Sequence, residues 1–335
     1  MILMKTFYIL DTFSLPTAYN HRFFVEKFAK GFSYNGYKVK IINSIKQLRE
    51  PGFVMVSDHN FYYSLGMRNN INGTLLWYFP ALLEKIDKFK LLITVNEKIQ
   101  KNALRKLAAQ IKNKNIILIA WYRNQQQNFI DLLNIPTIYT GEYFYSKPYD
   151  KKHLDWYNFY KSKKNALPIE FAADIDPKKV GKNCKNKKFK VSYVGNRSYN
   201  QSMYKEFEDM DDCSINPSPP YISEKKRIHI YKNSMVSLGF HAKLNIKNAI
   251  VNERVFESLA YGAICVSDNR YAPLATDNCA IFTKNLEELK KRVKSYNNNK
   301  YLRKKIRQKG FEMIKKRGTY MVQAKNFITL AKHLF

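Results

Sequence analysis

The chain has 335 residues, with 58 Lys and Arg against 27 Asp and Glu, which gives a formal net charge of +31. Its length predicts two domains, and its content of 45% hydrophobic and 15% aromatic residues excludes an intrinsically disordered protein. No apolar run approaches the roughly 20 residues of a membrane-spanning helix, and the four cysteines lack metal-ligand spacing. We therefore expect a folded, basic, cytoplasmic protein with reduced thiols.

The first half of the chain alternates between strand and helix patterns. Residues 6–10 read as a strand, and the following helix begins at Asn20, with Phe24, Phe28 and Phe32 on one face. Further short apolar runs, which suit strands buried on both faces, occur at 37–42, 53–57, 75–79, 91–95 and 116–120. This alternation predicts a doubly wound parallel sheet.

The second half repeats the pattern after a lysine-rich stretch, 178–190, which we interpret as an interdomain connection. Predicted strands cover 189–194, 235–240 and 264–266, and predicted helices cover 223–233, 253–261 and the chain from 286 onwards. The expected fold is α/β, with two Rossmann-like domains whose parallel sheets face each other across a cleft. We assign residues 1–166 and 167–335 to them, with a last helix at about 319–335 that packs back on the first domain.

The most informative segment is residues 237–269, SLGFHAKLNIKNAIVNERVFESLAYGAICVSDN. A strand ends at His241, a polar loop follows, and a short helix then carries Arg254 and Glu257. Free N–H groups and the dipole at a helix N-terminus favour phosphate, and a nearby cation neutralises it. A carboxylate one turn into the helix is able to accept hydrogen bonds from two ribose hydroxyls. The segment therefore suits a nucleoside diphosphate.

The run NERVFESLAYGAICVSDN resembles the donor-site signature of GT-B glycosyltransferases of the group 1 or spore-maturation type. The resemblance extends over the second domain: YVGN at 193–196 is similar to its first strand and glycine turn. The segment RGTY at 317–320 is similar to its usual His-Thr-Tyr, with Gly318 in place of histidine. The segment LPIEFAAD near Pro168 resembles its interdomain crossing. The resemblance implies a GT-B fold and a transferase that uses a nucleotide-activated sugar.

The resemblance also implies roles for individual residues of the donor site. Glu257 would bind the donor ribose, and Arg254 with the backbone near Asn252 would line the pyrophosphate. Gly195 would let a phosphate approach closely, with Arg197 just beyond it as a charge partner. Each residue has an ordinary structural alternative: Glu257 pairing with Arg254 on the helix surface, or Gly195 marking a strand-to-helix turn.

Two further donor-site candidates are His241 and Lys247. His241 stands at a strand end, where it either orients the sugar or its phosphate or is a hydrogen-bonded core histidine. Lys247 lies in the loop before the helix, together with Lys243. The sequence departs from many retaining relatives at Ala249, where they carry a second glutamate, and a glycine-rich first loop is absent at 11–19. The stereochemical course therefore stays open.

The first domain is expected to hold the acceptor, and an inverting transferase needs a general base there. Candidates for a catalytic residue are Asp58, His59 and His21, and Asp58–His59 directly follows the strand FVMVS. A polar loop that caps the next element is the alternative for this pair. Further polar candidates in this half of the chain are Asp11 and Glu142. Asp174 and Asp176 have the Asp-x-Asp spacing that metal-dependent GT-A enzymes use, but they lie in the predicted linker. We therefore expect no required metal and no cofactor besides the nucleotide sugar.

The function these features favour is transfer of a sugar from a nucleotide-activated donor to a hydroxyl of a surface glycan. The positive charge then binds an anionic membrane face that carries lipid-linked acceptors, or it belongs simply to a solvated protein surface. Three alternatives stay open: glucosylation of modified DNA bases, as in some phage GT-B enzymes, fucosyl transfer, and a degenerate domain that only binds nucleic acid or glycan.

Overall fold

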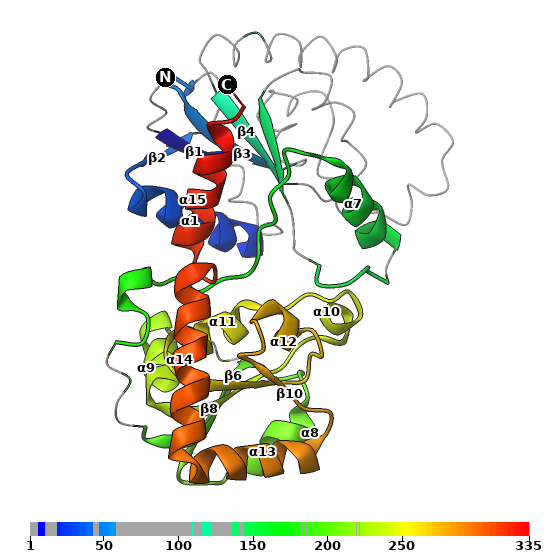
Figure 1. The fold of residues 1–335 in the computed structure, drawn as a ribbon, viewed down its shortest axis with the longest axis vertical. Coiled ribbons are helices and arrows are strands. Elements are labelled where there is room, and N and C mark those ends of the chain that lie inside the picture. Colours follow the sequence, from blue (N-terminus) through cyan, green and yellow to red (C-terminus); the bar gives the residue numbers. More distant parts are fainter. Residues whose placement is uncertain are drawn as a thin grey trace. The chain divides into compact units, whose positions relative to one another are not determined.

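The structure is a computed structural model (Figure 1). It describes residues 6–10, 19–42, 47–57, 109, 116–121, 136–140, 144–149, 151–182, 184, 187–218, 220 and 222–334. The chain divides into two compact units. The first comprises 1–141, 160–167 and 327–335, and the second comprises 142–159 and 168–326. This division places 142–159 with the second unit, whereas the sequence-based boundary at 166/167 placed them with the first.

In the part of the first unit that the structure describes, five strands form a parallel sheet in the order β2-β1-β3-β4-β5. Its strands are β1 (Thr6–Leu10), β2 (Lys38–Ile42), β3 (Gly52–Ser57), β4 (Ile116–Trp121) and β5 (Thr137–Thr140). Helix α1 (Tyr19–Tyr34) packs on this sheet through the predicted aromatic face, since Phe32 stacks on Phe7 at 4.2 Å and also contacts Phe53. Phe28 contacts Phe327, near the C-terminus. The predicted strands at 75–79 and 91–95 lie outside the described residues, and so does the side chain of Phe24.

The second unit has its own parallel sheet, in the order β10-β9-β8-β6-β7. Its strands are β6 (Phe189–Asn196), β7 (Cys213–Ser218), β8 (Ser234–Gly239), β9 (Ile264–Ser267) and β10 (Ile281–Phe282). Counted over the described strands of each unit, both sheets follow the order 2-1-3-4-5, which is a common doubly wound arrangement. The α/β class with two parallel sheets is therefore confirmed.

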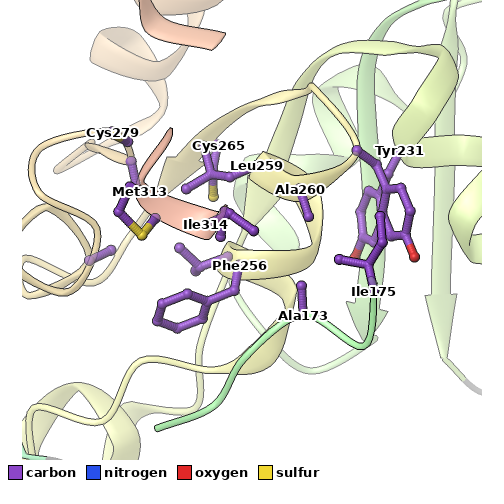
Figure 2. Close-up of a cluster of buried hydrophobic side chains, with 14 of the residues drawn as sticks. Ala173, Ile175, Tyr231, Phe256, Leu259, Ala260, Cys265, Cys279, Met313 and Ile314 are labelled. Carbon is purple, nitrogen blue, oxygen red and sulfur yellow. The ribbon is translucent and has the colours of Figure 1, made fainter. Parts of the chain in front are cut away.

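Helices cover both faces of the second sheet. On one face α9 (Glu224–Asn233), α11 (Glu253–Ala260) and α14 (Lys300–Lys316) enclose a core that includes Tyr231, Leu259 and Ile314 (Figure 2). On the other face α8 (Gln201–Tyr204) and α13 (Leu286–Asn298) cover Tyr193, Leu238 and Val266. The remaining helices are α7 (Lys151–Ser162), η5 (Pro177–Lys179), η6 (Lys205–Phe207), α10 (Lys243–Lys247), α12 (Ala272–Ala275) and α15 (Tyr320–Ala331).

The lysine-rich stretch 178–190 is not an interdomain connection, because it lies within the second unit. Cys184 anchors it there: its thiol donates to the carbonyl of Tyr261, and Arg307 of α14 donates to the carbonyl of Cys184. One of the points where the chain passes between the units is 167–168. Just beyond that point Ala173 exchanges backbone hydrogen bonds with Gly318 and Tyr320, which ties the crossing segment to the start of α15.

Candidate functional site

The strand order of the second unit identifies the edge where a ligand is expected. In a 2-1-3-4-5 sheet the chain reverses direction between the first and third strands, here β6 and β8, and ligands bind outside the carboxyl ends of the strands at that point. β6 ends at Gly195–Asn196 and β8 leads into Phe240–His241. The N-terminus of α11 reaches the same edge, since Asn252 donates through Nδ2 to the carbonyl of Phe240 at 3.1 Å.

His241 joins three elements at this edge. Its Nδ1 lies 3.0 Å from Oδ1 of Asp268, which follows β9, and its Nε2 lies 3.1 Å from the backbone nitrogen of Asn252. Since the Asn252 N–H donates to Nε2, that nitrogen is unprotonated and Nδ1 carries the proton toward Asp268. Burial lowers the pKa of His241, and the repulsion of Arg254 adds to this against the opposing pull of Asp268. The imidazole is therefore neutral and holds α11 to the sheet, as in the second of the two roles the sequence left open.

Arg254 stands in the first turn of α11 and faces the ends of β6 and β8. Its Nη1 donates to the carbonyl of Phe240 at 3.3 Å, and its guanidinium lies 5.6 Å from the ring centre of Tyr199, in the turn after β6. The N-cap residue beside it, Asn252, has a buried Oδ1 without a hydrogen-bond partner. The edge thus combines a half-buried cation, a helix N-terminus and an acceptor that a ligand hydroxyl is able to satisfy.

Glu257 lies one turn deeper in α11, and its side chain is only 4% exposed. Oε1 pairs with Nη2 of Arg227 on α9 at 2.9 Å. Glu257 is therefore not the helix-surface carboxylate of the structural alternative, because it is buried and pairs with Arg227. Arg254 turns toward Phe240 and Tyr199. Burial works against the charge of Arg227, but Glu257 and neighbouring acidic groups outweigh it, so the pKa of the guanidinium is raised.

Gly195 has a packing requirement of its own. A Cβ at this position would lie 2.5 Å from the hydroxyl oxygen of Tyr193, whose ring folds back so that the hydroxyl donates to the carbonyl of Asn196. Tyr193 also stacks on Tyr204 at 4.6 Å. The glycine therefore lets Tyr193 close the end of β6, which is a sufficient structural reason for its presence.

The other donor-site candidates are placed at the margins of this edge. Arg197 is exposed, and its backbone is held by Ser218 and by the hydroxyl of Tyr204. Lys247, at the end of α10, lies 5.8 Å from the ring centre of Tyr149. The loop between α10 and α11 is buried, and Ala249 adopts a left-handed backbone with φ of 57°.

The acceptor-side candidates are largely beyond the described residues. Asp58 and His59 directly follow β3, and they lie outside the described residues, as do Asp11 and Glu142. His21 belongs to α1, and its side chain is not among those described. Within the described part of the chain, no group of three His, Cys, Asp or Glu residues is arranged to hold a metal ion.

Sequence reasoning missed three residues of this site. Asp268 accepts hydrogen bonds from His241 and from Nδ2 of Asn200, a residue in a left-handed conformation after β6. Asp268 directly follows a strand, which is the same sequence feature that identified His241 as a candidate. The sequence could therefore have identified Asp268 too. Arg227 lies 30 residues before Glu257 on another helix, and no spacing in the sequence links the two.

Comparison with known proteins bears on the second unit. Residues 183–329 match the family model described as "Glycosyl transferase-like". No curated protein matches the chain. A solved structure of the DNA modifying enzyme beta-glucosyltransferase, with and without uridine diphosphoglucose, aligns with 98% of this chain and 99% of its own. Its sequence identity is 13% and its TM-score is 0.44.

Proposed function

We propose that this chain, whose residues 183–329 match the family model described as glycosyl transferase-like, is a glycosyltransferase that takes its sugar from a nucleoside diphosphate donor bound at the ends of β6 and β8. The observation that carries the proposal is the convergence of Asn252, Arg254 and His241 on that edge. Both ring nitrogens of His241 form hydrogen bonds within the protein, so His241 positions the helix and does not contact the donor.

The charge at this edge suits a diphosphate. The first N–H groups of a helix lack partners within the helix and point along its axis, and the helix dipole adds positive potential at the same end. Arg254 adds a full positive charge within the first turn of α11. Glu257, one turn later, supplies the carboxylate that accepts from the ribose hydroxyls.

Catalysis in this proposal depends on holding the two reactants and stabilising the leaving group. As the acceptor hydroxyl attacks the anomeric carbon, the bond from that carbon to the diphosphate breaks and negative charge grows on the diphosphate. Fixed N–H groups and a fixed guanidinium stabilise that charge without reorganising. A general base among His21, Asp58 and His59 would take the proton of the hydroxyl.

The acceptor we propose is a hydroxyl of a surface glycan, reached at an anionic membrane face. None of the helices that the structure describes has the length and apolar character needed to cross a bilayer. The test incubates the protein with UDP-, GDP-, ADP-, CDP- and dTDP-sugars and with lipid-linked or soluble glycans, and follows nucleotide release and glycan mass. Transfer to glycan supports the proposal. Donor binding without hydrolysis or transfer would indicate a non-catalytic binding protein.

A second candidate acceptor is duplex DNA, which the charge of α14 favours. This helix carries eight Lys or Arg residues against a single acidic residue, Glu312. Contacts between lysines and phosphates make binding fall steeply with salt. The test follows sugar incorporation into duplex DNA that contains hydroxymethylated bases while the salt concentration is raised from about 50 to about 300 mM, a range in which counterion release weakens binding. Incorporation that is lost over this range would select DNA over glycan as the acceptor.

A further inference from the structure

Arg227 and Glu257 form an ion pair that is closed off from solvent on the carboxylate side. The distance from Nη2 to Oε1 is 2.9 Å, and the two side chains are 19% and 4% exposed. Nε of Arg227 is buried and has no hydrogen-bond partner. The contact of the guanidinium with Oε1 of Glu257 is made through Nη2.

The pair places a cation beside a buried carboxylate. A carboxylate removed from water to this extent tends to take up a proton unless a cation lies beside it. The guanidinium of Arg254 is directed to the strand ends, where it donates to the carbonyl of Phe240 and lies over the ring of Tyr199. Arg227 comes from α9, whose Tyr231 packs in the same core as Leu259 of α11 (Figure 2). Ile230 of α9 belongs to this core as well, so the backbone position of Arg227 is fixed.

We propose that Arg227 is a positioning residue that keeps Glu257 ionised and aimed so that the carboxylate accepts from the ribose hydroxyls. Arg227 thereby makes the site selective for ribonucleoside over 2′-deoxyribonucleoside diphosphates. This inference rests on the proposed function, in which Glu257 binds the donor ribose. An ionised carboxylate accepts from two hydroxyls, whereas a protonated one loses part of that capacity and its fixed direction.

The test measures the dissociation constants of UDP, GDP, ADP and CDP and of their 2′-deoxy counterparts by titration calorimetry. Wild type is compared with Arg227→Met, Arg227→Lys and a matched control, Lys225→Met, which changes an exposed cation on the same helix. A hydrogen bond to a charged group predicts that wild type prefers the ribonucleotide by about 10- to 100-fold. In Arg227→Met we expect the preference to fall below about threefold, with 2′-deoxynucleotide affinity nearly unchanged.

Arg227→Lys keeps a cation but loses the planar guanidinium, so we expect an intermediate preference, and Lys225→Met should keep the full one. A merely structural role predicts equal weakening of both nucleotides and an unchanged ratio, which would overturn the inference and leave the proposed function intact. Failure of wild type to bind any of the nucleotides would overturn both. Should Arg227→Met not fold by near-ultraviolet circular dichroism, Arg227→Lys decides: an unchanged ratio there overturns the inference.

Discussion

The backbone N–H of Asn252 donates to Nε2 of His241 across 3.1 Å. A helix N-cap is thus held by a buried side chain from the neighbouring strand, and the other nitrogen of that side chain is held by Asp268 from the next strand. This chain of hydrogen bonds, from Asn252 through His241 to Asp268, fixes the position of the first turn of α11 relative to β8 and β9. Because Arg254 and Glu257 belong to this helix, these hydrogen bonds set the geometry of the whole candidate site.

Substitution of His241 by Gln should lower the free energy of unfolding and make it less dependent on pH. Loss of two buried hydrogen bonds predicts a fall of about 2–3 kcal/mol in the free energy of unfolding at pH 7.5. In wild type, burial lowers the pKa of His241 below its ordinary 6.5, reinforced by Arg254 and opposed by Asp268. The unfolded state then binds more protons below pH 6.5, so wild-type stability falls with decreasing pH by up to about 1.4 kcal/mol per unit.

Urea denaturation of wild type and His241→Gln between pH 7.5 and 5.5 checks this prediction. The difference in the free energy of unfolding should shrink as the pH falls, because only wild type loses the contribution of a neutral imidazole. A difference that stays constant would mean that His241 titrates alike in the folded and unfolded states.

Gly195→Ala should destabilise the protein through Tyr193. The new Cβ would stand 2.5 Å from the tyrosine hydroxyl oxygen, and overpacking of this kind costs about 1–3 kcal/mol. In a Tyr193→Leu background the same change should cost much less, since the obstructing ring is gone. Equal costs in both backgrounds, measured by urea denaturation, would contradict the packing explanation. Nucleotide titration of the same four proteins reports separately on whether Gly195 also serves phosphate approach.

Two buried tyrosines of the second unit should respond oppositely to loss of their hydroxyls. The hydroxyl of Tyr231 is buried without a partner, so Tyr231→Phe should leave stability unchanged or raise it by up to about 1 kcal/mol. The hydroxyl of Tyr320 lies 3.3 Å from Oε1 of Glu253, so Tyr320→Phe should lower stability by about 1 kcal/mol. The pKa of each hydroxyl is raised by burial, so neither ionises near neutral pH. Matching losses in the two variants would contradict the assignment.

The Arg227–Glu257 pair should show the behaviour of a buried ion pair. Arg227→Met leaves a carboxylate without its cation, which predicts a loss of about 3–5 kcal/mol. The double variant Arg227→Met with Glu257→Met removes both charges, and its stability should return to within about 1–2 kcal/mol of wild type. Thermal or urea unfolding of the three proteins measures this. Additive losses in the double variant would mean that the two side chains are not coupled.

Elements with strong local patterns were predicted from the sequence. The packing of Phe28 and Phe32 on α1 is confirmed. The apolar runs of β3, β4 and β6 are confirmed too, because a strand buried on both faces must be apolar throughout. β7, with the sequence CSINPS, was missed, because it is an outer strand of the sheet and only half buried. β10 was missed as well, since two residues carry no pattern.

The candidate site was predictable where it follows the chain and unpredictable where it depends on packing. The strand end at His241 and the helix carrying Arg254 are read directly from the sequence. The partners of Glu257 and His241 come from α9 and from the end of β9, which only tertiary structure brings together. The basic stretch 178–190 was misread because low apolar content resembles a linker, whereas a few contacts, such as those of Cys184, hold it to the second unit.

The most direct test of the account is titration of wild type and Glu257→Gln with UDP, GDP, ADP and CDP and, separately, with inorganic pyrophosphate. Glutamine keeps the size of the side chain but removes the charge that the ribose hydroxyls require. We expect Glu257→Gln to lose about 10- to 100-fold in affinity for the nucleotide that wild type binds best, with pyrophosphate affinity unchanged. Undiminished binding of that nucleotide by Glu257→Gln would show that the buried carboxylate only joins α11 to α9, and would remove it from the donor site.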